Sequence, residues 1–351
     1  MHIPDGYLSP QTYVPAYGVM LPLWWRASVK LKKTLRNRQV PILALGAAFS
    51  FVIMMFNVPI PGGSTGHAVG GVLVAILLGP WAAMVAVTLA LVVQALMFGD
   101  GGITALGANC LNMAVLMPFT GWWTYRLISR NAPVGSRRHW IGAAVGGYVG
   151  LNVAALFTGI MFGIQPLIAH DAAGRALYCP FGLKLALPAM CLSHLLVFGL
   201  VEAVVTGFVV AYLQRVEPSL LSGQPERVGD KAKVHGRRFG AIVATLIVIC
   251  PLGLYLPAKF GAGSAWGEWS ADEIGMLAGY VPSGLRHLGS AWHAPMPDYA
   301  IRGQESQSAV YVLTAVIGIA CIVVLVFVLK KIMWRRRVEA DTRLDAPTDR
   351  V

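Results

Sequence analysis

Residues 308–333 read SAVYVLTAVIGIACIVVLVFVLKKIM, an apolar stretch long enough to cross a membrane as one helix. A bilayer-spanning helix needs about 20 consecutive apolar residues. Comparable stretches fill much of the remaining chain, at 11–29, 40–60, 64–79, 80–98, 106–129, 140–163, 186–214 and 238–257. Hydrophobic residues make up 56% of the 351 residues and charged residues 13%, whereas a soluble domain carries about 25% charged residues. The sequence therefore predicts an all-α polytopic membrane protein.

These stretches predict nine membrane spans, a seven-helix bundle before residue 215 and two further helices after it. The third and fourth stretches are short, and Gly79-Pro80 between them predicts a tight turn that joins two helices. The first stretch contains Pro15 and Pro22, so it could be irregular rather than helical.

Lysine and arginine set the expected orientation, because the cytoplasmic loops of membrane proteins are enriched in both. Basic clusters follow spans one, five, seven and nine, which all end on one side: Arg26, Lys30, Lys32, Lys33, Arg36 and Arg38; Arg126, Arg130, Arg137 and Arg138; Arg215, Arg227, Lys231, Lys233, Arg237 and Arg238; Lys330, Lys331, Arg335, Arg336 and Arg337. We expect the N-terminus outside and the C-terminus in the cytoplasm of a multi-pass protein of the cell (inner) membrane. The net charge of +12 follows from this topology, and its secondary effect is attraction to anionic membrane lipid. The charge therefore requires no nucleic-acid partner.

The order of apolar and polar segments predicts four parts. They are a membrane domain at 1–215, a cytoplasmic linker at 216–237, a two-span unit at 238–334 with an outer segment at 258–307, and a cytoplasmic tail at 335–351. In the outer segment, Ser270-Ala271-Asp272-Glu273 is a capping-box pattern that predicts the start of a short helix. Trp266, Trp269, Tyr280 and Trp292 suggest that this segment is an interfacial or docking element.

The first two residues, Met1-His2, bring three nitrogens within reach of one metal ion. These are the α-amine, the peptide nitrogen of His2 and the His2 imidazole, which together close a five-membered and a six-membered chelate ring. Such a set suits Ni²⁺ or Cu²⁺, then Co²⁺, better than it suits Ca²⁺ or Mg²⁺. Residues 1–10 lack the basic start of a cleavable signal peptide, so we expect a free amine on the outer face. A histidine at position 2 usually has no such role, so the assignment of a metal site depends on whether the chain offers further ligands.

The segment from Asn57 to His67, NVPIPGGSTGH, can supply the next ligand. Its prolines and glycines predict a rigid, irregular turn, which a membrane protein tolerates only where it is buried in protein or lines a cavity. The charge pattern places His67 on the same side as His2, so its imidazole can add a fourth nitrogen. The alternative is that His67 only packs or caps in a loop.

The next outer loop, FGDGGIT at 98–104, leads to Asn109 and Asn112. Asp100 and these two amides, with Asn57 from the previous loop, could orient the histidines by hydrogen bonds. An Asp in an Asp-Gly-Gly sequence is more often only a turn residue.

The strings MHIPDGYLSP, PGGSTGHAVGG and LLGPWAAM…QALMFGDGGITALGANCLNMA together resemble the substrate-binding (S) component of energy-coupling-factor transporters for nickel and cobalt, the CbiM/NikM family. The resemblance covers about residues 1–215. It implies that Met1, His2 and His67 hold the metal, which is the transported substrate, Ni²⁺ or Co²⁺. The two-span unit, with APMPDYA at 294–300, resembles the NikN-like accessory component fused to the S component, although more loosely.

The resemblance also implies partners: a transmembrane coupling (T) subunit and two cytoplasmic ATPase subunits. The sequence holds no G-x-x-x-x-G-K-[ST] pattern, so no ATP site of the P-loop kind is expected on this chain, and no enzyme activity. Metal affinity should fall with falling pH, because the ligands must lose protons to bind.

Two other functions remain open at this level. An intramembrane hydrolase could use Ser64, but Ser64 and His67 lie three residues apart in one loop and form no recognisable dyad. An ion-coupled secondary transporter would need carboxylates within its spans, and Glu202 is the candidate. We expect Glu202 to pair instead with a polar neighbour in its own span.

Overall fold

The computed structural model describes residues 1–34, 39–60, 63–222, 232–301, 303–304 and 306–344. The described chain is mostly helical. Its helices up to residue 222 are α1 (Pro10–Thr34), α2 (Val40–Met54), α3 (Gly71–Leu78), α4 (Pro80–Val93), α5 (Leu106–Asn109), α6 (Met117–Ser129), α7 (Arg137–Gly163), α8 (Gln165–Ile168), α9 (Leu183–Ser193), α10 (Gly199–Val216) and α11 (Ser219–Ser222). They are followed by α12 (Ala232–Ile249), α13 (Leu252–Lys259), α14 (Ala271–Ala278), α15 (Ser283–Leu288) and α16 (Gln307–Leu344).

Among the described residues, four helical segments are long and apolar enough to cross a bilayer, namely Pro80–Phe98, Arg137–Ile168, Leu183–Val216 and Gln307–Ile332. A fifth candidate is the pair Arg238–Ile249 and Leu252–Lys259, which is bent by 41°. The other expected spans form helices that are shorter, like α2 and α3, or less apolar, like α1 and the segment from α5 to α6. The described part of the chain is thus a helical membrane protein with four or five clear spans.

The expectation of a purely helical fold fails at one place. Val58–Ile60 (β1) and Ser64–Gly66 (β2) form a two-stranded antiparallel hairpin, with Val58 opposite Gly66. Pro59 cannot donate the backbone bond that a helix needs, and β-branched residues flank it. The described residues of the loop that we expected to be irregular are therefore two paired strands, and the second strand leads directly to His67. Residues 61–62 of this loop lie outside the described residues.

Local signals elsewhere are confirmed. Gly79 separates α3 from α4 as a turn, and Ser270 and Glu273 form both bonds of a capping box at the start of α14. Pro15 and Pro22 do not interrupt α1, which runs as one helix of 25 residues. Neighbouring helices in a membrane protein can satisfy the backbone groups that a proline frees.

The polar segments are more helical than expected. α12 begins at Ala232, inside the predicted linker, and α16 continues to Leu344, inside the predicted tail. Arg, Lys, Glu and Ala favour helix, so an apolar helix extends easily into such sequence. Residues 223–231 of the linker and 345–351 of the tail lie outside the described residues.

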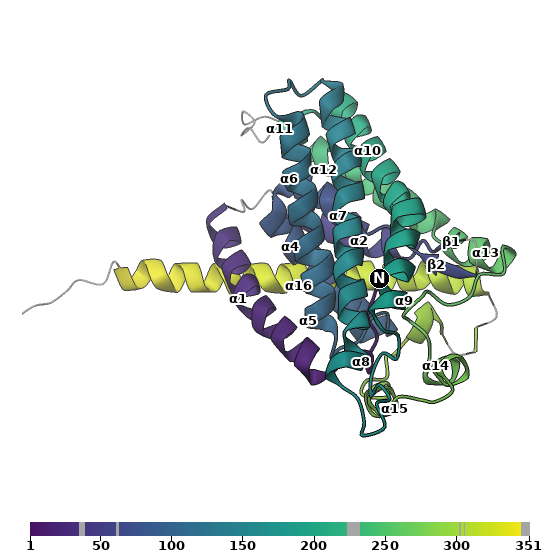
Figure 1. The fold of residues 1–351 in the computed structure, drawn as a ribbon. Helices are drawn as coiled ribbons and strands as arrows, with labels where there is room; N and C mark the ends of the chain where they lie inside the picture. Colours follow the sequence, from purple (N-terminus) through teal and green to yellow (C-terminus); the bar gives the residue numbers. More distant parts are fainter. Residues whose placement is uncertain (35–38, 61–62, 223–231, 302, 305, 345–351) are drawn as a thin grey trace, which may run out of the picture.

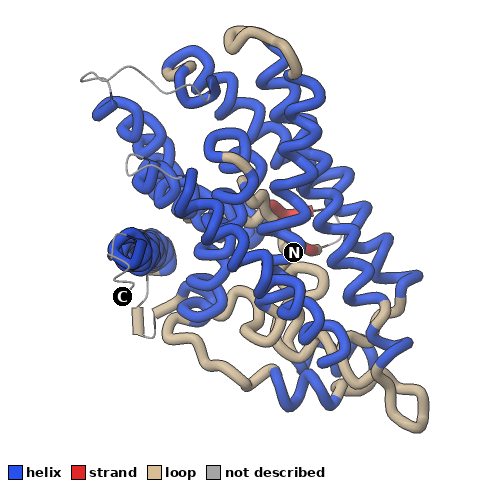
Figure 2. The backbone as a smooth tube through the Cα atoms, turned by 90° about the vertical axis from the view of Figure 1, so that its left-hand side faces the viewer, coloured by secondary structure: helices blue, strands red, loops and turns tan. Residues whose placement is uncertain are grey.

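The helices place the N-terminus inside the protein (Figure 1). α7 packs closely against α6, α9 and α10, and α16 packs on α2 while running across the direction of α7 (Figures 1 and 2). The C-terminal ends of α1 and α16, together with α11, lie toward the top and left of Figure 1, whereas α14 and α15 lie toward the lower right. α11 and the pair α14 and α15 thus lie at opposite ends of this view, whereas the C-terminal end of α16 lies on the left, level with the N-terminus.

In the described part of the bundle, three π-helical turns interrupt the helices: η2 (Gln94–Phe98), η3 (Cys110–Leu116) and η4 (His194–Phe198). Each adds a local widening of the helix, a feature often found near functional sites. The first two flank the loop that holds Asp100, and Phe198 of the third packs against Gly66 at the end of the hairpin. These turns position the segments that meet the N-terminus.

Candidate metal-binding site

The N-terminal segment is buried between the loops of the membrane domain. Asn109 holds it by both ends of its amide: Oδ1 accepts from the Ile3 N–H at 2.9 Å, and Nδ2 donates to the Ile3 carbonyl at 3.1 Å. Asp5 accepts the backbone N–H groups of Ile103 and Thr104 at 3.1 and 2.7 Å. These bonds fix the first five residues against the Asp-Gly-Gly loop.

Gly102 explains why this loop needs glycine. Its N–H donates to the Ile3 carbonyl at 2.8 Å, so the two backbones are in contact. A Cβ at this position would lie 2.3 Å from the Asp5 nitrogen, where no side chain fits. The Asp-Gly-Gly sequence is therefore not only a turn, since it also forms the seat of the N-terminal segment.

Two histidines from distant parts of the sequence meet at this seat. His67 Nε2 lies 3.2 Å from His2 Nδ1, and Asp100 Oδ1 lies 2.9 Å from the same His2 atom. His2 is 2% exposed and His67 6%. The other His2 ring nitrogen, Nε2, is buried without a hydrogen-bond partner in the described part of the chain.

Glu202 on α10 holds the segment that carries His67. Its carboxylate accepts the Val69 N–H at 2.8 Å and the Gly70 N–H at 3.0 Å, and Thr206 donates to it at 3.2 Å. The expected polar neighbour in its span is thus confirmed as Thr206. Its two backbone bonds show that Glu202 also fixes the segment between the hairpin and α3.

Burial and nearby charges set the protonation of His67 and Asp100. Burial lowers the pKa of His67 well below its ordinary value, and the positive N-terminus and His2 lower it further. This direction favours the neutral imidazole, in which Nδ1 donates to the Ala68 carbonyl at 3.1 Å and the Nε2 lone pair faces His2. Burial alone would raise the pKa of Asp100, but the charge and hydrogen bond of His2 outweigh this and lower it. Asp100 is accordingly an anion beside the histidines.

The C-terminal unit forms the other wall of the site. Glu268 Oε1 lies 3.3 Å from the Met1 amine. Tyr299 donates to Asp100 Oδ2 at 2.6 Å, and Gln94 donates to the same oxygen at 3.0 Å. The sequence analysis missed Glu268 and Tyr299 as site residues. The available signals were indirect, since Glu268 stands between two of the tryptophans that predicted docking and Tyr299 lies in the segment 294–300.

Docking of the outer segment is visible in its contacts. The rings of Trp266 and Trp269 pack against Phe181 at centroid distances of 5.7 and 5.5 Å. Trp292 donates from its indole to the Leu96 carbonyl at 2.9 Å. The segment therefore packs on the membrane domain of the same chain.

Not all predicted residues reach the site. Asn112 donates instead to Thr158 of α7 at 2.9 Å. Asn57 lies beside Gly253 of α13, and no hydrogen bond between the described residues joins it to either histidine. Its expected role and that of Asn112 in orienting the histidines are not supported by these contacts.

Ser64 has a structural role. Its hydroxyl accepts the Trp266 N–H at 2.9 Å and donates to the Ser264 carbonyl at 3.4 Å. The hydroxyl therefore joins the hairpin to the C-terminal unit, and this arrangement gives no support to a nucleophile.

The geometry fits an ion bound by nitrogen. Two nitrogens that bind one ion at about 2.0 Å and at right angles lie about 2.8 Å apart, which is close to the 3.2 Å between the two imidazoles. Among the described residues, no group of three or more His, Cys, Asp or Glu side chains is arranged to hold a metal. A site here would thus depend on the backbone nitrogens of residues 1 and 2.

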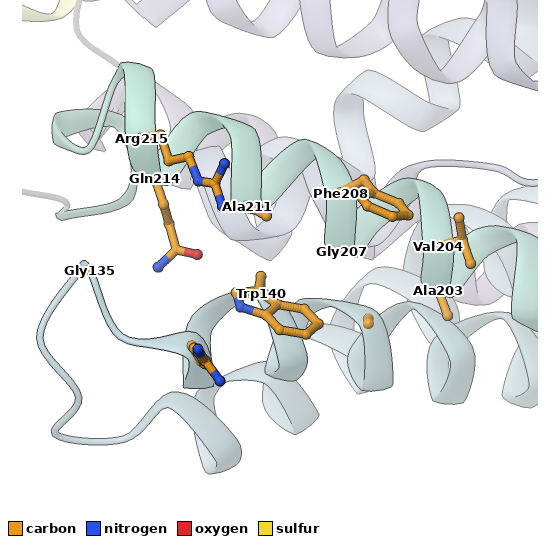
Figure 3. Close-up of a pocket in the computed structure, with 11 residues that line it drawn as sticks. Gly135, Trp140, Ala203, Val204, Gly207, Phe208, Ala211, Gln214 and Arg215 are labelled. Carbon is orange, nitrogen blue, oxygen red and sulfur yellow. The ribbon is translucent and has the colours of Figure 1, made fainter.

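A groove on the described surface lies elsewhere, between α7 and α10. It has a volume of about 720 Å³ and shares no residue with the histidine site. Trp140 and Phe208 border it, small residues such as Gly207 and Ala211 lie along it, and Arg215 lies toward one end (Figure 3). Its apolar lining offers no set of metal ligands.

A family model described as the cobalt uptake substrate-specific transmembrane region, CbiM, matches residues 2–220 of the chain. The chain belongs to the CbiM family. A second model, the PDGLE domain, matches residues 237–335. Membership confirms the class predicted from the sequence, a multi-pass membrane transport protein and not an enzyme.

Relatives share both parts of this CbiM-family chain. The fused nickel transport protein NikMN of Rhodobacter capsulatus is 48% identical over 92% of this chain and 95% of its own length. The probable fused nickel transport protein LarMN of Lactiplantibacillus plantarum is 44% identical over 93% of this chain and 96% of its own. The fusion of S component and accessory unit that the sequence predicted is therefore confirmed.

Two crystal structures resemble somewhat more than three-fifths of the chain. A truncated transition metal transporter is 53% identical, with a TM-score of 0.58, and aligns over 62% of this chain and 99% of its own. A second transition metal transporter has the same identity and TM-score over 63% of this chain and 97% of its own.

Proposed function

We propose that this chain captures Ni²⁺ or Co²⁺ on the outer face of the membrane for an ATP-driven importer of the energy-coupling-factor type. The ion would be held by the Met1 amine, by the backbone and imidazole nitrogens of His2, and by His67. The observation that carries the proposal is that His2 and His67 meet at 3.2 Å beside a buried terminal amine.

The chemistry of the ligands favours these ions. Four nitrogens around one ion suit nickel and copper, with cobalt next, and exclude ions that require oxygen ligands. Two relatives that align with more than nine-tenths of the chain are named nickel transport proteins, whereas the family model is named for cobalt. We infer that nickel is the preferred substrate, with cobalt also accepted.

Each side chain then has a part in binding. The lowered pKa of His67 favours its neutral form, which can bind the ion without first losing a proton. The amine and the His2 peptide nitrogen must each lose a proton, so affinity should rise with pH. Asp100 would orient the histidines and balance the charge of the ion, while Asn109 holds the peptide that follows His2.

The remaining parts of the proposal concern the assembly. We infer nine spans with the N-terminus outside, a metal-binding domain at 1–215 and an accessory unit at 238–334. The energy would come from a coupling subunit and two ATPase subunits. Glu202, the candidate for ion coupling, is satisfied by two backbone N–H groups and Thr206, and no other contact in the described structure favours a secondary transporter.

The decisive test extends the N-terminus by two alanines, because a single added residue would create a terminal X-X-His sequence that itself chelates Ni²⁺ through four nitrogens. The extension converts the Met1 amine into a peptide nitrogen and pushes added residues into a buried site, so Ni²⁺ binding by the purified chain should be lost. The control appends the same two alanines after Val351, and intact mass establishes the N-terminus of each protein. Equal Ni²⁺ affinity of the two extended proteins would refute the proposed ligand set.

A further inference from the structure

The accessory unit reaches the candidate metal site through one charged side chain. Glu268 Oε1 lies 3.3 Å from the Met1 amine, although 267 residues separate them in the sequence. We propose that Glu268 is a positioning residue for the metal site: it holds the terminal amine in place and strengthens it as a ligand. This inference rests on the proposed function, because it assumes that the amine binds the ion.

The backbone around Glu268 is fixed. Its N–H donates to the Ala265 carbonyl at 3.0 Å, which closes a turn. Gly267 within this turn has φ +85°, and a Cβ there would lie 2.7 Å from the Phe162 ring. Only glycine fits both restrictions. The turn therefore sets the direction of the Glu268 side chain against the membrane domain.

Aromatic packing anchors the turn on both sides of Glu268. The Trp266 ring contacts Phe162 and Phe181 at centroid distances of 5.8 and 5.7 Å. Trp269 contacts Phe181, and its carbonyl accepts the Tyr7 hydroxyl at 2.8 Å. A carboxylate on so rigid a support can hold the amine in one position rather than follow it.

The segment around Glu268 is hydrogen-bonded to both parts of the chain that carry the proposed ligands, the N-terminal segment and the hairpin before His67. The N–H of Gly263 donates to the Gly63 carbonyl at 2.6 Å, and that of Trp266 to the Ser64 hydroxyl, both in the hairpin that precedes His67. Tyr7, which follows the Met1-His2 pair, is bonded to Trp269. Glu268 lies between these attachments, so the segment sets the spacing of amine and imidazole.

Glu268 can keep this contact when an ion is bound. A neutral amine that donates its lone pair to a metal still has two N–H groups, and a carboxylate can accept one of them. Partners of this kind orient a ligand and increase its basicity, and losing one costs metal affinity about 10- to 100-fold. The Met1 side chain is 1% exposed and that of Glu268 26%, so the carboxylate stands at the rim and the amine inside.

The test compares Glu268→Gln and Glu268→Ala with Asp272→Asn in the full-length chain. Asp272 is an exposed carboxylate in the same outer segment and contacts neither histidine nor amine in the described structure. Ni²⁺ titration should give wild-type affinity for Asp272→Asn, a decrease of about 10-fold for Glu268→Gln and up to about 100-fold for Glu268→Ala. The ligand-field absorption band of bound Ni²⁺ should move to longer wavelength in both Glu268 variants, because the amine becomes a weaker donor.

The outcomes separate this inference from the proposed function. Wild-type affinity and an unmoved band in Glu268→Ala would overturn the role of Glu268 while leaving the ligand set intact. Lower thermal stability with an unmoved band would reduce Glu268 to a structural contact and also overturn it. If a Glu268 variant does not purify, Glu268→Asp replaces it, because this variant keeps the negative charge on a side chain that is one methylene shorter. A shifted Ni²⁺ band in Glu268→Asp would support the role of Glu268, and an unmoved band would overturn it. Failure of wild-type protein to bind Ni²⁺ or Co²⁺ would refute the proposed function itself.

Discussion

Asn109→Ala should weaken metal binding strongly although Asn109 is not a proposed ligand. Asn109 is 2% exposed and makes two hydrogen bonds to Ile3, one to the N–H and one to the carbonyl. The carbonyl keeps its bond from Gly102, but the Ile3 N–H loses its partner in the variant. A buried donor left unpaired costs about 1–3 kcal/mol, and the second lost bond about 1 kcal/mol.

Together, these two losses weaken the binding of the N-terminal segment in its buried position by about 2–4 kcal/mol. Since 1.4 kcal/mol is a factor of ten, the affinity for Ni²⁺ should fall about 30- to 1,000-fold. Isothermal titration of the purified protein measures this directly. The larger value applies if the segment leaves its seat in the variant, and the smaller value if Asp5 still holds it through Ile103 and Thr104.

Asn112→Ala is the matched control. Asn112 is equally buried, lies three residues further along the same helical segment and donates to Thr158 instead of the N-terminal segment. Its loss should lower thermal stability while leaving Ni²⁺ affinity within about threefold, which is under 1 kcal/mol. The reasoning would be refuted if the two variants lost affinity equally, because the effect would then follow from general destabilisation.

Three further predictions concern the same face. His67→Ala should abolish high-affinity Ni²⁺ binding, whereas His170→Ala and His293→Ala should retain it; equal losses in a titration would contradict the assignment. Gly102→Ala should lower affinity at least tenfold, because the new Cβ would lie 2.3 Å from the Asp5 nitrogen, and an unchanged titration would exclude this seat for the N-terminus. The metal-free protein should lose thermal stability as the pH falls below about 6.5, the ordinary pKa of histidine. The pKa of His67 is lowered in the folded state, so the unfolded chain binds the proton first, at a cost of at most about 1.4 kcal/mol per pH unit. His67→Gln should flatten the melting temperature between pH 6.5 and 5, and an equal slope in both proteins would contradict the neutral state of His67.

The sequence by itself determined the class of protein, and it was sufficient to propose the ligands of the candidate site. Membrane class follows from hydropathy, which is a sum over neighbouring residues and needs no knowledge of packing. The proposed ligands could be found because Met1 and His2 are adjacent and their chelate rings are local. His67 stands at the end of a segment whose prolines and glycines predicted a rigid, irregular turn, although its described residues form paired strands. The turn at Gly79 and the capping box at Ser270 are local in the same sense.

Only the tertiary structure decided which residues surround the ligands. Asn109 and Asn112 lie in one short segment and look equivalent in sequence, but one faces Ile3 and the other Thr158. A π-helical turn begins between them at Cys110, and it changes which side each residue occupies in a way that a regular helical period does not predict. Glu268 and Tyr299 reach the site from the far end of the chain. Their contacts depend on how the outer segment packs. That packing is stabilised by aromatic contacts and backbone hydrogen bonds to several segments that are distant in the sequence, so no local pattern predicts it.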